Sequence, residues 1–137
     1  MENSSTILAG SAVRDELLIA GMPPVNLLLA GAHGAIRTTL GTLLRNVEGP
    51  ILAWYPGERL VLPRHPRVGT MILHEVGLMD YEDQLQLLEW LETRAARIQI
   101  VSTTSSPLLP RVESGAFNDT LYYRLNTMHV DVNESRS

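Results

Sequence analysis

Short apolar runs that alternate with helical patterns are the feature that most restricts the fold of this chain. Apolar runs bounded by turn residues predict strands at 25–30, 51–54, 70–73 and 98–103, and a last strand is expected at 128–132. Helices are expected at 36–47, 81–96 and 119–125. Fully apolar strands that alternate with helices are typical of βαβ units in a mostly parallel sheet. The sequence therefore predicts a three-layer α/β domain with five strands.

The helix expected over 81–96 has a clear apolar face. Leu85, Leu88, Leu91 and Ala95 share one side of it, and Trp90 flanks them. We interpret these residues as core or helix-packing positions. The preceding segment, residues 55–69, is rich in proline and glycine and is expected to be mostly loop.

Composition excludes several classes of function. The chain has 137 residues, a length typical of one domain, and its net charge of −4 leaves no basic footprint for nucleic acid. It contains no cysteine, which rules out disulfides and thiolate metal sites, and all of its positive side chains are arginine. The acidic start Met1-Glu2-Asn3 does not fit a secretory signal, and the longest apolar run, Leu27–Ala32, is too short to span a bilayer. We expect a cytoplasmic protein with no DNA or membrane partner.

Several segments resemble one family when they are taken in order. Residues 115–126, GAFNDTLYYRLN, are similar to the G-R-F-R-x-D-L-Y-Y-R-L-N segment of the bacterial sigma-54 activators, which are AAA+ ATPases. Residues 69–77, GTMILHEVG, resemble the family's G-T-L-F-L-D-E-I-G. Residues 84–88 and 99–105 resemble the family's L-Q-x-K-L-L and R-I-I-A-A-T-N, and residues 8–13 give a weaker match. Several motifs in the right order are more specific than any one of them.

The resemblance implies a P-loop NTPase fold of the AAA+ type in a single domain, residues 1–137. Its core would cover about residues 8–132, and residues 133–137 would form a flexible tail. Family members hydrolyse ATP in rings, and two arginines of the finger segment reach the nucleotide of the neighbouring subunit. The family's inherited activity would therefore be ATP hydrolysis.

Five positions that handle nucleotide in the family are altered in this chain. Ile36 replaces the third glycine of the phosphate loop, Arg37 its lysine, His74 the Mg²⁺-binding acid, Ser105 the sensor asparagine and Asn118 the first finger arginine. Arginine is not a conservative substitute for lysine at such a site, and histidine is a poor Mg²⁺ ligand. The remaining candidates are Glu75 and Arg124 for catalysis and Gly31, Gly34, Arg37, Thr38 and Ser105 for nucleotide binding.

Other parts of a complete activator are not expected in this chain. Residues 55–69 occupy the place of the family's sigma-54-contacting loop and contain nothing like its G-A-F-T-G-A motif. We also expect neither the helical lid nor a DNA-binding domain.

Simpler interpretations of the same residues stay open. Gly31 and Gly34 could merely turn a strand into a helix, and Arg37 could be a surface residue. Glu75 could be an idle inherited carboxylate, and Arg124 could pair with a local acid such as Asp119. His74 and Glu75, with His33 nearby, suggest a metal pair, but a single partly buried histidine is much commoner. We therefore assign no metal site.

The resemblance and its departures lead to two functional hypotheses. The first is a non-catalytic, transcription-related regulatory or ring-assembly partner, which would bind an intact AAA+ activator or self-associate. The second is a residual ATP-binding protein with weak ATPase activity. The first needs no cofactor, and the second would need ATP and Mg²⁺. A gene remnant without a selected function is a third possibility that sequence does not separate from the first.

Overall fold

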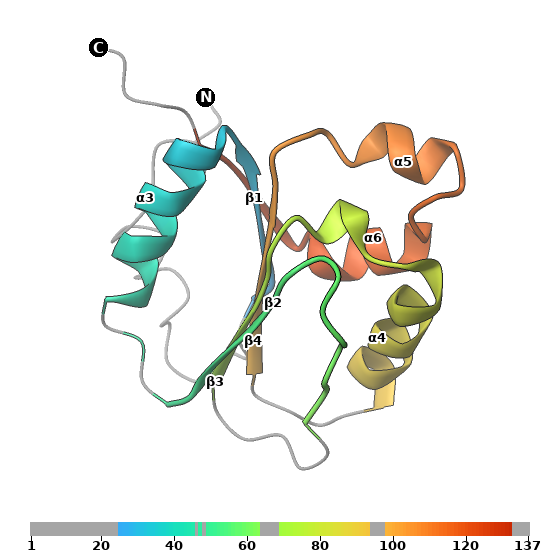
Figure 1. The fold of residues 1–137 in the computed structure, drawn as a ribbon, viewed down its shortest axis with the longest axis horizontal. Helices are drawn as coiled ribbons and strands as arrows, with labels where there is room; N and C mark the ends of the chain where they lie inside the picture. The colour runs from blue at the N-terminus through green and yellow to red at the C-terminus, as the bar shows by residue number, and fades with distance from the viewer. Residues whose placement is uncertain (1–24, 46, 48, 64–68, 94–97, 133–137) are drawn as a thin grey trace.

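The computed structural model of the protein describes residues 25–45, 47, 49–63, 69–93 and 98–132. The strands are β1 (Leu27–Gly31), β2 (Ile51–Trp54), β3 (Gly69–Leu73), β4 (Ile98–Thr104) and β5 (Met128–Val132). The helices are α3 (His33–Leu44), the 3₁₀ turn η1 (Val76–Leu78), α4 (Tyr81–Thr93), α5 (Leu109–Glu113) and α6 (Asp119–Leu125) (Figure 1). None of the described helices is long and apolar enough to cross a membrane.

The five strands form one sheet in the order β2-β3-β4-β1-β5, and every neighbouring pair is parallel. Helix α3 lies on one face of this sheet, and α4 and α6 lie on the other (Figure 1). The predicted three-layer α/β architecture with five strands is confirmed.

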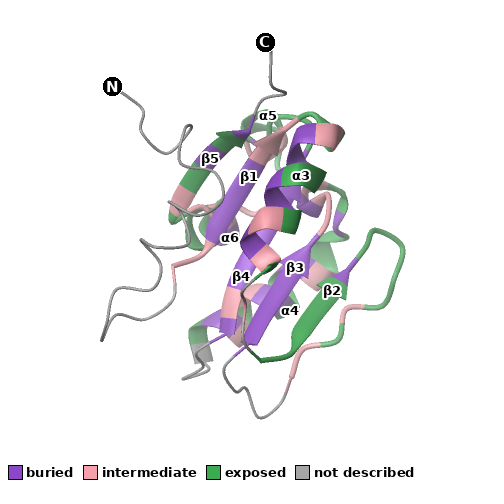
Figure 2. Cartoon of the chain, turned by 90° about the vertical axis from the view of Figure 1, so that its left-hand side faces the viewer, coloured by how far each residue is buried: buried purple, intermediate pink, exposed green. Residues whose placement is uncertain are grey.

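The direction of the connections explains why the two faces are covered unequally. The connections from β2 to β3, from β3 to β4 and from β4 to β5 all advance in one direction along the sheet, whereas the connection from β1 to β2 returns. Because crossovers between parallel strands share one handedness, the three advancing connections lie on one face and the returning one on the other. Helix α3 is therefore alone on its face among the described elements. Strand β2 is an edge strand of the sheet, and its Ile51 is 46% exposed (Figure 2).

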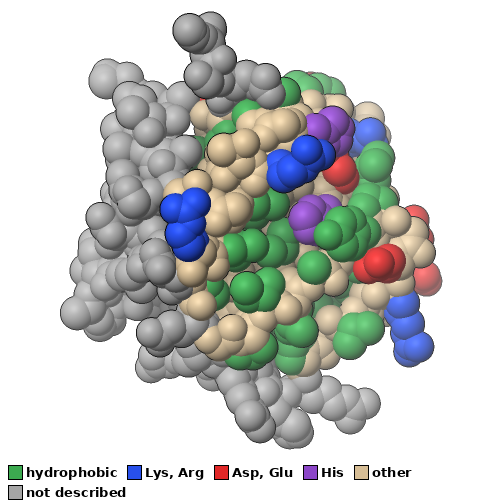
Figure 3. All heavy atoms as spheres, turned by 60° about the vertical axis from the view of Figure 1, so that its left-hand side comes forward, with side chains coloured by type: hydrophobic (Ala, Val, Ile, Leu, Met, Phe, Trp, Pro, Cys, Tyr) green, Lys and Arg blue, Asp and Glu red, His purple; other side chains and the backbone are tan. Residues whose placement is uncertain are grey.

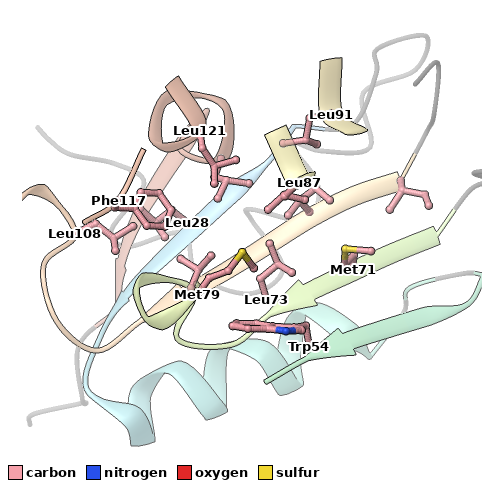
Figure 4. Packing of buried hydrophobic residues seen from close by; sticks show 14 residues of the cluster. Leu28, Trp54, Met71, Leu73, Met79, Leu87, Leu91, Leu108, Phe117 and Leu121 are labelled. Atoms are coloured by element: carbon pink, nitrogen blue, oxygen red, sulfur yellow. The ribbon is translucent and has the colours of Figure 1, made fainter. Parts of the chain in front are cut away.

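Two apolar clusters fill the spaces on either side of the sheet. The larger cluster lies under α4 and α6, and Figure 4 shows side chains from the strands meeting those of the helices. Its members include Leu28, Trp54, Leu73, Leu87, Phe117 and Leu121. The smaller cluster lies under α3 and includes Leu27, Leu29, Ile36, Leu40 and Val130. The alternation of Leu27, Leu28 and Leu29 between clusters is the period of two of a strand buried on both faces.

The expected core face of α4 is wrong in one respect. Leu85 is 44% exposed, whereas Gln84 and Leu87 are fully buried. Leu91 is buried, and Leu88 and Trp90 are partly buried against the larger cluster, as expected. The buried stripe includes a polar residue, so a pattern of apolar residues alone gives the wrong rotation of the helix.

The element boundaries also differ from expectation in places. Helix α3 begins at His33, three residues before its expected start, and α5 occupies part of a segment expected to be loop. Helix α6 and strand β5 have the predicted bounds. The motif at 8–13, Ala95 and the tail 133–137 lie outside the described residues.

Candidate functional site

The connection between β1 and α3 consists of Ala32 alone. The N–H of Ile36 donates to the carbonyl of Ala32 at 2.9 Å, so Ile36 already belongs to the regular hydrogen bonding of the helix. Gly34 lies in the first turn of α3, and Gly31 ends β1. A Cβ atom at Gly31 would lie 1.9 Å from the carbonyl oxygen of Val132 in β5. Glycine is therefore required at position 31 by the neighbouring strand.

Arg37 and Thr38 lie on the exposed side of α3. Arg37 forms no ion pair with another described residue. The Thr38 hydroxyl donates to the carbonyl of Gly34 at 3.1 Å. Neither side chain is oriented by a contact with the strand ends.

Glu75 follows β3 and has a left-handed backbone, with φ 48° and ψ 58°. Such a conformation costs about 1–3 kcal/mol for a residue other than glycine and is found mostly where the surrounding structure enforces it. Here the Glu75 N–H donates to Thr103 Oγ1 at 3.0 Å, and Oε1 accepts from the Ser105 N–H at 3.1 Å. His33 Nδ1 lies 3.5 Å from Glu75 Oε2. The structure thus brings Glu75, Ser105 and His33 together at the carboxyl ends of the strands.

His74 stacks on Tyr55, with ring centroids 4.1 Å apart and planes 3° from parallel. Burial lowers the pKa of the His74 imidazole, and the carboxylates of Glu75 and Glu58 oppose this effect. The neutral ring is therefore favoured, and it packs on an aromatic face. No group of three His, Cys, Asp or Glu side chains within the described ranges could hold a metal ion.

A hollow of about 190 Å³ lies between the β1–α3 connection and the loops that follow β3 and β4. It is lined by His33, Glu75, Gly77, Leu78, Thr104, Ser105, Ser106 and Arg111. It is smaller than the roughly 300–1,000 Å³ typical of pockets for drug-sized ligands. Figure 3 shows histidine, arginine and carboxylate side chains gathered on the visible face. The sequence did not single out Arg111, because its helix α5 was expected to be loop.

Arg124 lies at the opposite end of the sheet from this hollow. Its carbonyl accepts from Asn26 Nδ2 at 2.9 Å, and Asn26 directly precedes β1. At about 3.3 Å per residue, the length of β1 separates the two ends by roughly 15 Å or more. The guanidinium contacts Glu92 Oε2 at 3.3 Å, and both side chains are exposed. The local acid beside Arg124 is thus Glu92 rather than Asp119.

Asn118 caps helix α6. Its Oδ1 accepts from the Leu121 N–H at 2.9 Å, and its Nδ2 donates to the Tyr81 hydroxyl at 3.1 Å. Asparagine is among the preferred residues at this position because its side chain satisfies a free backbone N–H. The residue at the first finger position thus has a structural role within this chain.

Gln84 forms hydrogen bonds with the segment that begins α6. The sequence analysis did not identify this role. Its Nε2 donates to the carbonyls of Met79 and Ala116, at 2.9 and 3.0 Å. Its Oε1 accepts from the Asn118 N–H at 2.7 Å. The residue therefore links the turn after Glu75 to the segment that begins α6. A polar residue on the apolar side of a helix is the sequence signal that could have identified it.

Comparison with known proteins gives one family. A family model described as the sigma-54 interaction domain matches residues 9–134. The probable regulatory protein WtsA of Pantoea stewartii is 32% identical over 80 residues, which are 50% of this chain and 25% of WtsA. The chain therefore spans about a quarter of the length of that relative.

Two solved structures share the fold. The P-loop NTPase domain of a sigma-54 transport activator from Escherichia coli gives a TM-score of 0.62 at 18% identity, covering 99% of this chain and 100% of that domain. NtrX of Brucella abortus in complex with ATP gives 0.63 at 18% identity, covering 80% of this chain and 33% of NtrX.

Proposed function

Because this chain belongs to the sigma-54 interaction domain family, of the AAA+ type, we propose that it is a non-catalytic assembly or regulatory partner in sigma-54-dependent transcription. The observation that carries the proposal is the start of α3 at His33, directly after Ala32. A phosphate loop holds phosphates with backbone N–H groups that point into the loop. Here the Ile36 N–H is bonded inside the helix, and the β-branched Ile36 side chain is buried in the core.

The residues at the site also fit Mg²⁺ poorly. Mg²⁺ prefers oxygen ligands in octahedral geometry, and the position of the expected acid carries the neutral, stacked imidazole of His74. Arg37 is exposed and lies outside the hollow, and the Thr38 hydroxyl is bonded to its own helix. These contacts favour weak or absent binding of Mg²⁺–ATP, and no step of hydrolysis is assigned to Glu75.

The segment that would face a neighbouring subunit is held in place by hydrogen bonds within this chain. Gln84 and Asn118 fix the start of α6, and Arg124 is exposed at the end of the sheet away from its own hollow. An arginine placed there is available to another subunit and not to the site of its own chain. This supports a protein-binding role that does not depend on nucleotide, with an intact AAA+ activator as the partner.

The proposal is tested by two measurements on the purified chain. We expect no ATP hydrolysis above that of the Glu75→Gln variant, and we expect the chain to bind an intact sigma-54 activator and inhibit its transcription in a reconstituted assay. Turnover that Glu75→Gln abolishes would overturn the non-catalytic assignment. A chain that neither binds nor inhibits the activator would overturn the partner assignment and favour a gene remnant.

A residual ATP-binding function is the second candidate, and the geometry around Glu75 favours it. Glu75 has a strained backbone conformation beside the hollow. Its N–H donates to Thr103 Oγ1, and its carboxylate accepts from the Ser105 N–H. A protein of similar fold has been solved with ATP. Titration with a fluorescent ATP analogue, with and without Mg²⁺, separates the two functions. Micromolar, Mg²⁺-dependent binding would favour this candidate over the first.

A further inference from the structure

Arg111 brings an unpaired positive charge to the hollow from helix α5. Figure 1 shows α5 and the start of α3 at the same end of the sheet. The guanidinium forms no ion pair or hydrogen bond with any residue that the structure describes. A Cβ atom at Gly77 would lie 3.2 Å from Arg111 Cδ and 3.4 Å from its Nε, so the stem of the arginine packs against the glycine. Packing therefore positions the guanidinium, and its N–H donors are available to a ligand in the hollow.

Glu75 brings a negative charge to the same hollow from the end of β3. Its Oε1 accepts from the Ser105 N–H, and its Oε2 lies 3.5 Å from His33 Nδ1. A neutral imidazole accepts through its unprotonated nitrogen, so Oε2 and Nδ1 offer two neighbouring acceptors to one donor group. Glu75 and Arg111 both line the hollow, yet they form no ion pair with each other. Two opposite charges thus face one space without neutralising each other.

The other walls of the hollow supply hydroxyl groups and an apolar side chain. The hydroxyls of Ser105 and Ser106 form no hydrogen bond within the described part of the chain. Both serines are exposed, so their hydroxyls can turn toward a ligand. Leu78 also lines the hollow and is 53% exposed. A ligand that carries both charges and a small apolar group would find a partner for each of them here.

The volume of the hollow limits the size of its ligand. A water molecule's share of liquid volume is about 30 Å³, so a hollow of about 190 Å³ holds about six non-hydrogen atoms. An adenine nucleotide is several times larger, whereas a small amino acid is of this size. Inorganic phosphate also fits by size, but the Glu75 carboxylate would repel it.

We propose that the hollow binds a small, free α-amino acid in its zwitterionic form. The ammonium group donates to Glu75 Oε2 and His33 Nδ1. The carboxylate accepts from the Arg111 guanidinium, a charge-assisted pairing that also fixes the orientation of the ligand. The short side chain lies against Leu78. The inference goes beyond the proposed function, because it concerns a free ligand and requires neither ATP nor an intact activator.

An NMR titration of the full, isotope-labelled 137-residue chain tests the proposal with probes of equal size. L-alanine carries both charges, L-lactate has a hydroxyl in place of the ammonium, and L-alaninamide has an amide in place of the carboxylate. We expect L-alanine to shift the backbone amide signals of Gly77, Ser105 and Ser106. It should bind at least about tenfold more tightly than either analogue, because hydrogen bonds to charged groups are the strong ones. An analogue that binds as tightly as L-alanine, or L-alanine that leaves these signals unchanged, would overturn the proposal.

Variants at the two charged residues assign each end of the ligand. Arg111→Gln and Glu75→Gln should each weaken L-alanine binding by about tenfold or more. Arg59→Gln and Glu82→Gln are matched controls, because both residues are exposed and lie outside the hollow, and they should bind L-alanine like the unmodified chain.

The preference between probes separates a contact with the ligand from a purely structural role. Arg111→Gln should no longer distinguish L-alanine from L-alaninamide but should still prefer L-alanine to L-lactate, and Glu75→Gln should show the reverse. Such a pattern arises only if each residue interacts with its own end of the ligand. Variants that bind all three probes more weakly, with the preferences of the unmodified chain, would contradict the assignment.

Discussion

Replacing Gln84 by methionine should destabilise the fold strongly, although the two side chains have similar size. The substitution leaves three backbone groups without their partner: the carbonyls of Met79 and Ala116 and the N–H of Asn118. A buried polar group left unpaired costs about 1–3 kcal/mol. Only the bond to Met79 is fully buried, because water can reach part of the other two. We therefore expect a loss of about 2–4 kcal/mol in the free energy of unfolding.

Urea denaturation followed by circular dichroism measures this loss, and Gln86→Met is the matched control. Gln86 is exposed on the same helix, so its replacement should change stability by less than about 0.5 kcal/mol. Hydrogen exchange adds a local readout, since the Leu121 N–H depends on Asn118, which Gln84 holds. That amide should exchange faster in Gln84→Met at urea concentrations well below the transition. If Gln84→Met is no less stable than Gln86→Met, the buried amide does not hold the segment, and the reasoning fails.

Three further predictions concern the site and its helix. Because burial lowers the pKa of His74 from 6.5, its contribution to stability is fully present above about pH 6.5 and is lost as pH falls toward the lowered value. Urea midpoints between pH 5 and 8 should show this slope, and His74→Phe should remove it; an unchanged slope would refute the assignment. Gly41→Ala should raise the free energy of unfolding by about 0.5–1 kcal/mol, whereas Gly31→Ala should lower it sharply; equal effects in thermal melts would contradict the structure. Ile36→Gly, Arg37→Lys and His74→Asp should restore nucleotide affinity only together, and additive gains in titrations of the single variants would argue against one shared Mg²⁺–phosphate unit.

Much of the fold could be predicted because most of its strands are short apolar runs bounded by turn residues. Strand β3, Gly69–Leu73, ends in an apolar run, and all five of its positions are buried. Helix α6 begins at a capping residue and ends where its apolar spacing stops, so its bounds were predictable. The rotation of α4 was not, because two of the three hydrogen bonds that satisfy the buried Gln84 amide are made to Ala116 and Asn118, which are distant in sequence.

The candidate site was predictable only in part. Glu75 and Ser105 follow neighbouring parallel strands, whose carboxyl ends meet at one edge of the sheet, so their proximity could be inferred. Arg111 could not be placed there, because α5 is short, contains a proline and lacks the apolar spacing of a longer helix. The start of α3 at His33 could not be predicted either, because residues 33–35 are compatible with a loop or with a helix. The hydrogen bond from the Ile36 N–H to the Ala32 carbonyl shows that these residues form a helix.

The close approach of β5 to Gly31 has a consequence for how this family is compared across genomes. The 1.9 Å separation between a hypothetical Cβ atom and the Val132 carbonyl means that selection on sheet packing alone would retain the glycine. A lineage could abandon ATP altogether and still keep that residue unchanged. The glycine at position 31 of this chain is therefore accounted for by the spacing of two strands, and its presence alone does not indicate that the chain binds ATP.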